Sequence, residues 1–295
     1  MPGGFTVGDF PPRFGLMNIT PSDPSLRYHE ARPPASIADW VEAIWWTEGD
    51  AGAGGFRHDV LPDGCADWIV SARDGKVASI FVGPMSKAAT VLLQPGERCF
   101  GLRFRPGALG RVARQPLDEM LDATVDPAVL PLAGSTRLTS AFAAGAPATA
   151  LIVQAEQLLR PWHRLAGVQE EPDKTRVVRA AGLLAARHED MTVAQIAAHT
   201  GMSVRTLRRV FASDVGLAPK AFARVMRMQA LLKTLTRRRF ATPDWAGLAA
   251  AHGFADQAHL VRECRALTGW TPAAFRAGLE NGRFLQYQPR SRPLE

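Results

Sequence analysis

Three arginines share one side of a short predicted helix in the last third of the chain. They are Arg205, Arg208 and Arg209, and their spacing places them on the same helix face. A guanidinium group is a planar fork of donors that binds a phosphate or pairs with the O6 and N7 atoms of guanine. The pattern therefore indicates a nucleic-acid-binding helix. For each arginine, phosphate contact and base contact both stay open.

Local signals on both sides of a turn position this helix. Thr192 followed by Gln195 is a capping box, which predicts a preceding helix over Val193–His199. Gly201 allows a tight turn, and Ser203 is a residue type that caps the next helix. Two short helices joined by such a turn are the helix-turn-helix arrangement, in which the second helix enters the major groove of DNA.

The face opposite the arginines is apolar. Leu207, Val210 and Phe211 recur at positions i, i+3 and i+4, so we expect them to be buried. The predicted helix is thus amphipathic, with its basic side turned outward.

The same pattern occurs a second time. The segment Gly216-Leu217-Ala218-Pro219-Lys220-Ala221-Phe222 recurs as Gly269-Trp270-Thr271-Pro272-Ala273-Ala274-Phe275, so the offset from 216 to 269 is 53 residues. Repetition at a fixed offset predicts a second unit of the same structure. In this copy Asp256 caps a helix whose outward side chains are Gln257, His259 and Arg262. A long helix from Pro219 through Leu235 is expected to join the two units.

These residues resemble the AraC/XylS family of bacterial transcription regulators. The resemblance covers roughly residues 175–280 and is carried by Leu248-Ala249-Ala250-Ala251-His252-Gly253-Phe254-Ala255-Asp256-Gln257-Ala258-His259-Leu260, followed by Gly269, Pro272 and Phe275. It departs at Cys264, where the family usually has Phe. The resemblance implies two recognition helices in successive major grooves, with Arg205, Arg208, Arg209, Gln257, His259 and Arg262 as the readers of base edges.

Charge divides the chain in the same way. Residues 1–173 hold 15 Lys and Arg against 20 Asp and Glu, a net charge of −5, whereas residues 174–285 hold 18 against 7, a net charge of +11. The charge distribution suggests that only the second part meets a polyanion, although a solvated basic face explains the charge alone equally well. The basic triplet Arg237-Arg238-Arg239 is better explained by a solvated loop or by the helix dipole than by DNA contact.

The first part of the chain predicts a β-rich domain. Short segments rich in Trp, Val, Ile and Phe alternate with turns, which is typical of a small barrel or sandwich, and helical segments follow at 109–114, 117–121 and 148–165. Val60-Leu61-Pro62-Asp63-Gly64-Cys65, Phe81-Val82-Gly83-Pro84 and Gly101-Leu102-Arg103-Phe104-Arg105-Pro106-Gly107 resemble the cupin-like N-terminal domain of some members of the same family. The resemblance implies an effector-sensing or dimerisation domain. The expected fold class is therefore α+β, a cupin-like barrel with flanking helices followed by an all-α domain.

A few residues of this domain are candidates for effector binding. Alternation puts Arg103 and Arg105 on one face of a strand, where an interior position would suit an anionic ligand and an exterior one would be a solvated surface. We favour the exterior position. Asp67 and Trp68 are further candidates, although we favour roles in a turn and in a packed core for them.

Enzymatic chemistry finds little support in the sequence. Between Trp40 and Gln115 the only histidine is His58, so a multi-histidine metal site cannot form there, and no phosphate loop or catalytic triad stands out. Cys65, Cys99 and Cys264 form no metal-ligand pattern, and Cys264 is expected in a helix core. Neither a signal peptide nor a membrane span is indicated, so we expect a cytoplasmic protein without a metal or cofactor.

The predicted organisation has four parts: a domain over 1–166, a linker over 167–173, a double helix-turn-helix domain over 174–285, and a flexible basic tail over 286–295. The expected function is sequence-specific regulation of transcription at promoter DNA, controlled by a small-molecule effector. Two alternatives stay open, a non-specific architectural DNA binder and an enzyme tethered to a DNA-binding domain. RNA polymerase and a second copy of the chain are further candidate partners.

Overall fold

The three-dimensional structure is a computed structural model that describes residues 26–162, 172–186, 191–237, 243–280 and 284. Several expectations fall outside these residues. They are most of the linker over 167–173, Arg238 and Arg239, and the tail over 286–295.

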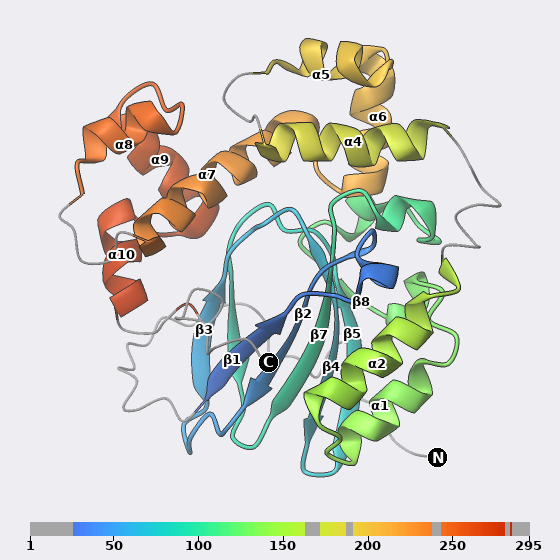
Figure 1. Ribbon diagram of the computed structural model, residues 1–295. Helices are drawn as coiled ribbons and strands as arrows, with labels where there is room; N and C mark the ends of the chain where they lie inside the picture. Colours follow the sequence, from blue (N-terminus) through green and yellow to red (C-terminus); the bar gives the residue numbers. More distant parts are fainter. Residues whose placement is uncertain (1–25, 163–171, 187–190, 238–242, 281–283, 285–295) are drawn as a thin grey trace.

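The N-terminal region, residues 26–162, is built on two antiparallel sheets (Figure 1). The larger sheet has the order β1-β2-β7-β4-β5-β8 and the smaller one pairs β3 with β6. The strands are β1 (Arg27–Ala31), β2 (Val41–Glu48), β3 (Phe56–Val60), β4 (Ala66–Arg73), β5 (Lys76–Val82), β6 (Ala89–Leu93), β7 (Arg98–Phe104) and β8 (Thr124–Val125).

The larger sheet buries both of its faces. On one face a cluster that includes Trp68, Phe100 and Phe104 packs against helices α1 (Ser135–Ala143) and α2 (Ala148–Leu159). On the other face a smaller cluster that includes Tyr28, Trp45 and Cys99 joins Phe56 and Leu93 of the smaller sheet. The two sheets therefore face each other across a shared interior. Strand alternation decides which side chains enter it.

The C-terminal region, residues 172–280, is helical. Its helices are α4 (Pro172–Ala186), α5 (Val193–Thr200), α6 (Val204–Val215), α7 (Pro219–Arg237), α8 (Trp245–Ala251), α9 (Gln257–Thr268) and α10 (Pro272–Glu280). Helix α7 runs between the α5–α6 pair and the α8–α9 pair (Figure 1). The expected α+β class, with a sheet region followed by a helical one, is confirmed.

Several elements differ from the sequence-based expectation. Strand β1 and helix α1 were not predicted from the sequence. The helices expected over 109–114 and 117–121 are short 3₁₀ turns, η3 (Leu109–Arg111) and η4 (Leu117–Met120). An edge strand of five residues such as β1 depends on its pairing with β2, so its own sequence shows no clear strand pattern.

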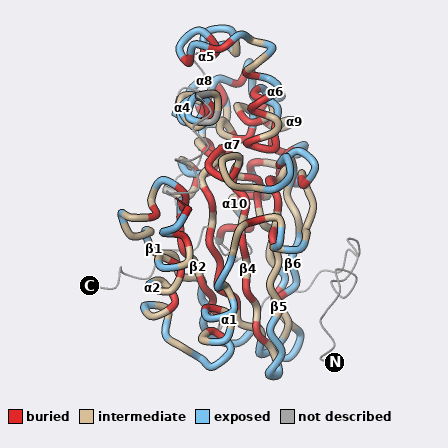
Figure 2. The backbone as a smooth tube through the Cα atoms, turned by 90° about the vertical axis from the view of Figure 1, so that its right-hand side faces the viewer, coloured by how far each residue is buried: buried red, intermediate tan, exposed pale blue. Residues whose placement is uncertain are grey.

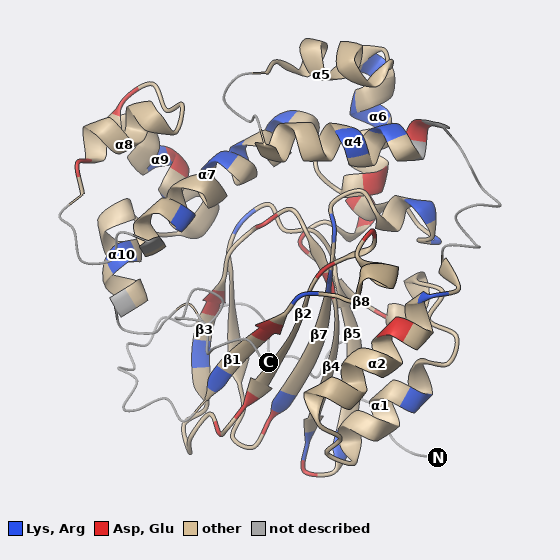
Figure 3. Cartoon of the chain, in the orientation of Figure 1, with Lys and Arg blue, Asp and Glu red and all other residues tan. Residues whose placement is uncertain are grey.

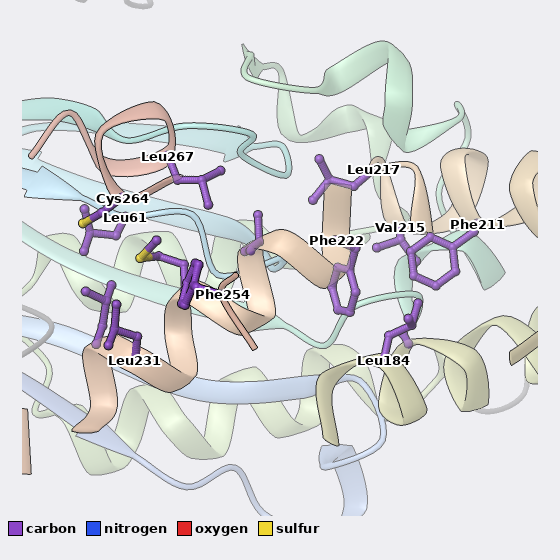
Figure 4. Close-up of a cluster of buried hydrophobic side chains, with 14 of the residues drawn as sticks. Leu61, Leu184, Phe211, Val215, Leu217, Phe222, Leu231, Phe254, Cys264 and Leu267 are labelled. Carbon is purple, nitrogen blue, oxygen red and sulfur yellow. The ribbon is translucent and has the colours of Figure 1, made fainter. Parts of the chain in front are cut away.

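The two regions are packed together through one buried cluster. Leu61, in the loop after β3, belongs to the same apolar cluster as Cys264 and Leu267 of α9 (Figure 4). The backbone N–H of Ala88 donates to the carbonyl of Leu267 at 2.8 Å. The buried side chain of Gln229 in α7 donates to the carbonyl of Pro62 at 2.7 Å. Figure 2 shows that buried backbone continues from the strands into the helices above them.

Candidate nucleic-acid interface

The first helix pair is held by the caps that the sequence predicts. The Thr192 hydroxyl accepts from the Gln195 N–H at 3.3 Å, and the Thr192 N–H donates to the Gln195 side chain at 2.8 Å, which completes the capping box. Gly201 ends α5 in the left-handed region at φ 66°. Ser203 then caps α6 by accepting from the Thr206 N–H at 3.0 Å. These bonds fix the turn between the two helices.

Helix α6 separates an apolar face from a basic one. Leu207 and Phe211 are fully buried and Val210 is nearly so. The three candidate readers Arg205, Arg208 and Arg209 are all exposed. Burial of the apolar face fixes the helix, so the arginines are presented to solvent on a rigid element.

The second helix pair repeats this construction. Asp256 caps α9 by accepting from the His259 N–H at 2.6 Å, and Leu260 and Cys264 are fully buried. Cys264 thus fills the position of Phe211, 53 residues earlier, without leaving the helix exposed. Of the candidate readers here, Gln257 and Arg262 are exposed.

His259 differs from the other candidate readers. It is half-buried, its Nδ1 accepts from the Ala255 N–H at 3.2 Å, and its ring meets the edge of the Phe254 ring at 5.7 Å between centroids. This side chain therefore also shapes the turn before α9. Only its remaining ring nitrogen is left to contact a ligand.

An ion pair between α7 and α9 was missed by sequence reasoning. The Arg224 guanidinium binds Glu263 with both ends of its fork, Nε to Oε2 at 2.7 Å and Nη2 to Oε1 at 3.0 Å. Glu263 follows the candidate reader Arg262, so the pair orients α9 on the connecting helix. No local signal links two residues 39 positions apart.

Basic side chains mark helices α4, α6, α7 and α9, whereas α8 has none (Figure 3). One helix, α7, therefore joins two helix pairs that have equivalent caps, equivalent cores and outward polar side chains. The chemistry available to this arrangement is hydrogen bonding to phosphates and to base edges.

Comparison with protein families agrees with this geometry. Residues 196–278 match a family described as a helix-turn-helix domain. The C-terminal region is therefore similar in sequence to helix-turn-helix domains. Residues 29–126 match a separate family, a domain of unknown function called DUF6597. No curated protein matches the chain significantly.

The chain is similar at low identity to solved structures of ToxT from Vibrio cholerae. ToxT from strain O395 has 7% identity and a TM-score of 0.38, over 86% of this chain and 98% of that one. ToxT bound to (E)-4-(8-methylnaphthalen-1-yl)but-3-enoic acid has 8% identity and a TM-score of 0.39, over 85% and 97%. ToxT with a bound unsaturated fatty acid has 7% identity and a TM-score of 0.35, over 85% and 94%.

A group of charged side chains lies in the interior between the two sheets of the N-terminal region. The Arg103 side chain, 14% exposed, approaches carboxylate oxygens of Asp63 at 3.3 Å, Asp67 at 3.5 Å and Glu30 at 4.0 Å. Trp45 Nε1 donates to Asp67 at 2.8 Å. We call these four charged residues, Glu30, Asp63, Asp67 and Arg103, the polar cluster. Its single cation faces three carboxyl groups, so it is better suited to a cationic than to an anionic guest.

The other candidate effector residues lie elsewhere. Trp68 is 1% exposed on the opposite face of β4, where its indole N–H donates to the Ser79 hydroxyl at 2.7 Å. Arg105 is half-exposed just beyond β7 and pairs with Glu42 at 2.6 Å. The favoured exterior position thus holds for Arg105, whereas Arg103 points into the interior. Alternation explains why Trp68 is separated from Asp67.

Burial dominates the ionisation of Asp67 in the polar cluster. It raises the pKa of Asp67 above the usual carboxyl value, an effect that Arg103 partly opposes. It also raises the pKa of the nearby Tyr28 phenol far above its ordinary value. Cys65 and Cys99 are buried thiols whose pKa is raised by burial, which makes them poor nucleophiles. Within the described part of the chain, no group of three His, Cys, Asp or Glu is placed to hold a metal, and no helix could span a membrane.

His58 gives the N-terminal region a predicted acid sensitivity. Its ring lies 6.3 Å from the Phe56 ring, and burial lowers its pKa from 6.5 to about 4. Because the unfolded chain binds a proton at higher pH than the folded one, stability is expected to fall as pH drops from about 6.5 to about 4. The free energy of unfolding, measured with urea across this pH range, should fall less steeply for His58→Gln than for the wild type. An equally steep loss in that variant would contradict the assignment.

Proposed function

We propose that this protein is a sequence-specific transcription regulator that reads promoter DNA with α6 and α9 and has no catalytic role. The observation that carries this proposal is the pair of equivalent units: each buries an apolar helix face at the same repeat positions and presents polar side chains outward. Because the single helix α7 joins the two units, both can contact the same side of a DNA duplex. The proposed readers are Arg205, Arg208, Arg209, Gln257, His259 and Arg262, acting in the cytoplasm.

We further propose that a small molecule bound in the N-terminal region alters DNA affinity. The polar cluster supports this part, because Asp67 and Arg103 lie in the interior and Asp63 belongs to a loop that touches α7. In that loop, residues 61–65, Pro62 accepts from Gln229 and Gly64 abuts Phe222. A guest that displaces Asp63 would therefore act on α7. RNA polymerase and a second copy of the chain stay open as further partners.

Polar readers in the second unit favour this function over a non-specific architectural binder. An amide such as Gln257 pairs with adenine but adds no charge for phosphate binding. A binder that used only phosphates would gain more from cations at these positions.

The test is binding of the full-length chain to DNA from its own upstream region, against scrambled DNA, in a salt series. Arg208→Ala is expected to lower affinity for the preferred site by about 1 to 3 kcal/mol, roughly 5- to 150-fold, with the loss confined to particular base pairs. The same titration with small-molecule cell extract added tests effector control, which predicts a change in affinity.

Arg137→Ala provides the control, because Arg137 is exposed on α1, away from the helix pairs (Figure 1). This variant should bind as the wild type does. Equal affinity of the wild type for scrambled and native DNA would favour the architectural alternative instead.

A further inference from the structure

A cavity of about 250 Å³ lies where the N-terminal region meets the first recognition helix. One wall comes from the segment between η3 and η4, and the other from α6 and the start of α4. Its lining includes Gly110, Arg114, Asp173, Arg209 and Asp214. The cavity is thus built jointly by the two regions and includes one candidate DNA reader, Arg209.

Two arginines share this cavity from opposite sides. Arg114 and Arg209 are both exposed, and among the described residues neither guanidinium group has an ion-pair partner. The backbone of Arg114 is held in place, since its N–H donates to the carbonyl of Val129 at 3.0 Å. A fixed backbone with a free guanidinium group is a ready donor for an anion.

Of the two carboxyl groups of the cavity, one is ion-paired and the other is buried. Asp173 forms an ion pair with Arg176 at 3.2 Å. Asp214 is buried, 6% exposed, and lies against the backbone of Gly110. The positive charge of the two arginines therefore dominates the solvent-facing side.

Close backbone contact keeps the two arginines together. A Cβ at Gly110 would lie 2.3 Å from the Cβ of Asp214 in α6, a distance that only glycine permits. The η3 turn consequently packs directly on α6. Arg114, a few residues beyond this turn, stays beside α6 as long as the regions remain docked.

We infer that Arg114 extends the DNA interface onto the N-terminal region by binding a phosphate of the backbone next to the groove that receives α6. Arg209 lies at the border between the outward face of α6 and the cavity, which sets Arg114 just outside the base-reading surface. Such a contact adds affinity without sequence preference. The inference rests on the proposed DNA binding.

The experiment compares full-length wild type, Arg114→Ala, Arg114→Lys and the control Arg137→Ala on specific and scrambled DNA over a salt series. Arg114→Ala is expected to weaken binding to both DNAs by the same factor and to reduce the slope of log Kd against log salt by about 0.9. Arg114→Lys should keep the wild-type slope, since the charge remains, and Arg137→Ala should change nothing.

Unchanged affinity and slope in Arg114→Ala, or tighter binding, would overturn the inference. A loss in Arg114→Ala that was confined to the specific DNA would also overturn it, because a contact to the phosphate backbone weakens binding to both DNAs equally. A wild type that binds no DNA at all would instead refute the proposed function.

Discussion

Replacing Arg103 by Met is expected to destabilise the protein by about 3 to 5 kcal/mol at neutral pH. Arg103 is the cation of the polar cluster, and its side chain is 14% exposed. Its removal leaves Asp63, Asp67 and Glu30 facing one another in the interior between the sheets. Methionine keeps most of the side-chain volume, so the expected loss reflects uncompensated charge rather than a cavity. Urea unfolding at pH 7 measures it.

The loss of stability in Arg103→Met should be largest at neutral pH and smaller in acid. Burial already raises the pKa of Asp67, and removing the opposing cation raises it further. An acid whose pKa is raised by folding destabilises the fold as it ionises, so the penalty is largest at neutral pH. It should shrink as pH falls toward the usual carboxyl range, where the unfolded chain is protonated too. The gap between wild type and Arg103→Met therefore narrows in acid.

Arg105→Met is the matched control, two positions further along the chain. Its ion pair with Glu42 joins side chains that are 42% and 47% exposed, and such pairs contribute about 1 kcal/mol or less. Similar losses for both variants would contradict the special role of Arg103. A loss for Arg103→Met that did not vary with pH would show that packing, and not charge, is lost.

The helix-turn-helix units were predictable because their signals are local. A short stretch of chain holds all of them: the capping box at Thr192, the N-cap at Ser203 and the buried face formed by Leu207 and Phe211. The repeat at 53 residues then identified the second unit, including Cys264 as a core residue. Local hydrogen bonds and helix periodicity decide such structure before any long-range contact forms.

The interior of the N-terminal region could not be predicted in the same way. Alternation placed Arg103 and Arg105 on one face, but the strand ends at Phe104, so Arg105 lies beyond the sheet and is half-exposed. Pairing of Asp67 with Arg103 across β4 and β7 depends on strand register. Register is fixed by the whole sheet, and a single strand does not reveal it.

The contacts between the two regions were also beyond sequence reasoning, and Phe222 tests them. Phe222 is fully buried, its ring meets the Phe211 ring at 5.4 Å, and a Cβ at Gly64 would lie 2.4 Å from its Cε2 atom. One side chain therefore joins the first recognition helix, the connecting helix and the loop over 61–65. Phe222→Ala should cost about 3 to 5 kcal/mol and loosen that loop.

Phe275 provides a control from within the repeat, because it occupies the equivalent position 53 residues later and is equally buried. It packs on Phe284 at 4.5 Å between ring centroids, whereas the atoms nearest Gly64 belong to Phe222 and Met226. Both alanine variants should lose comparable stability in urea. Amide hydrogen exchange should rise over residues 61–65 only in Phe222→Ala. Equal exchange there in both variants would mean that the loop is held independently of α7, and the proposed route from the polar cluster to the DNA-binding helices would fail.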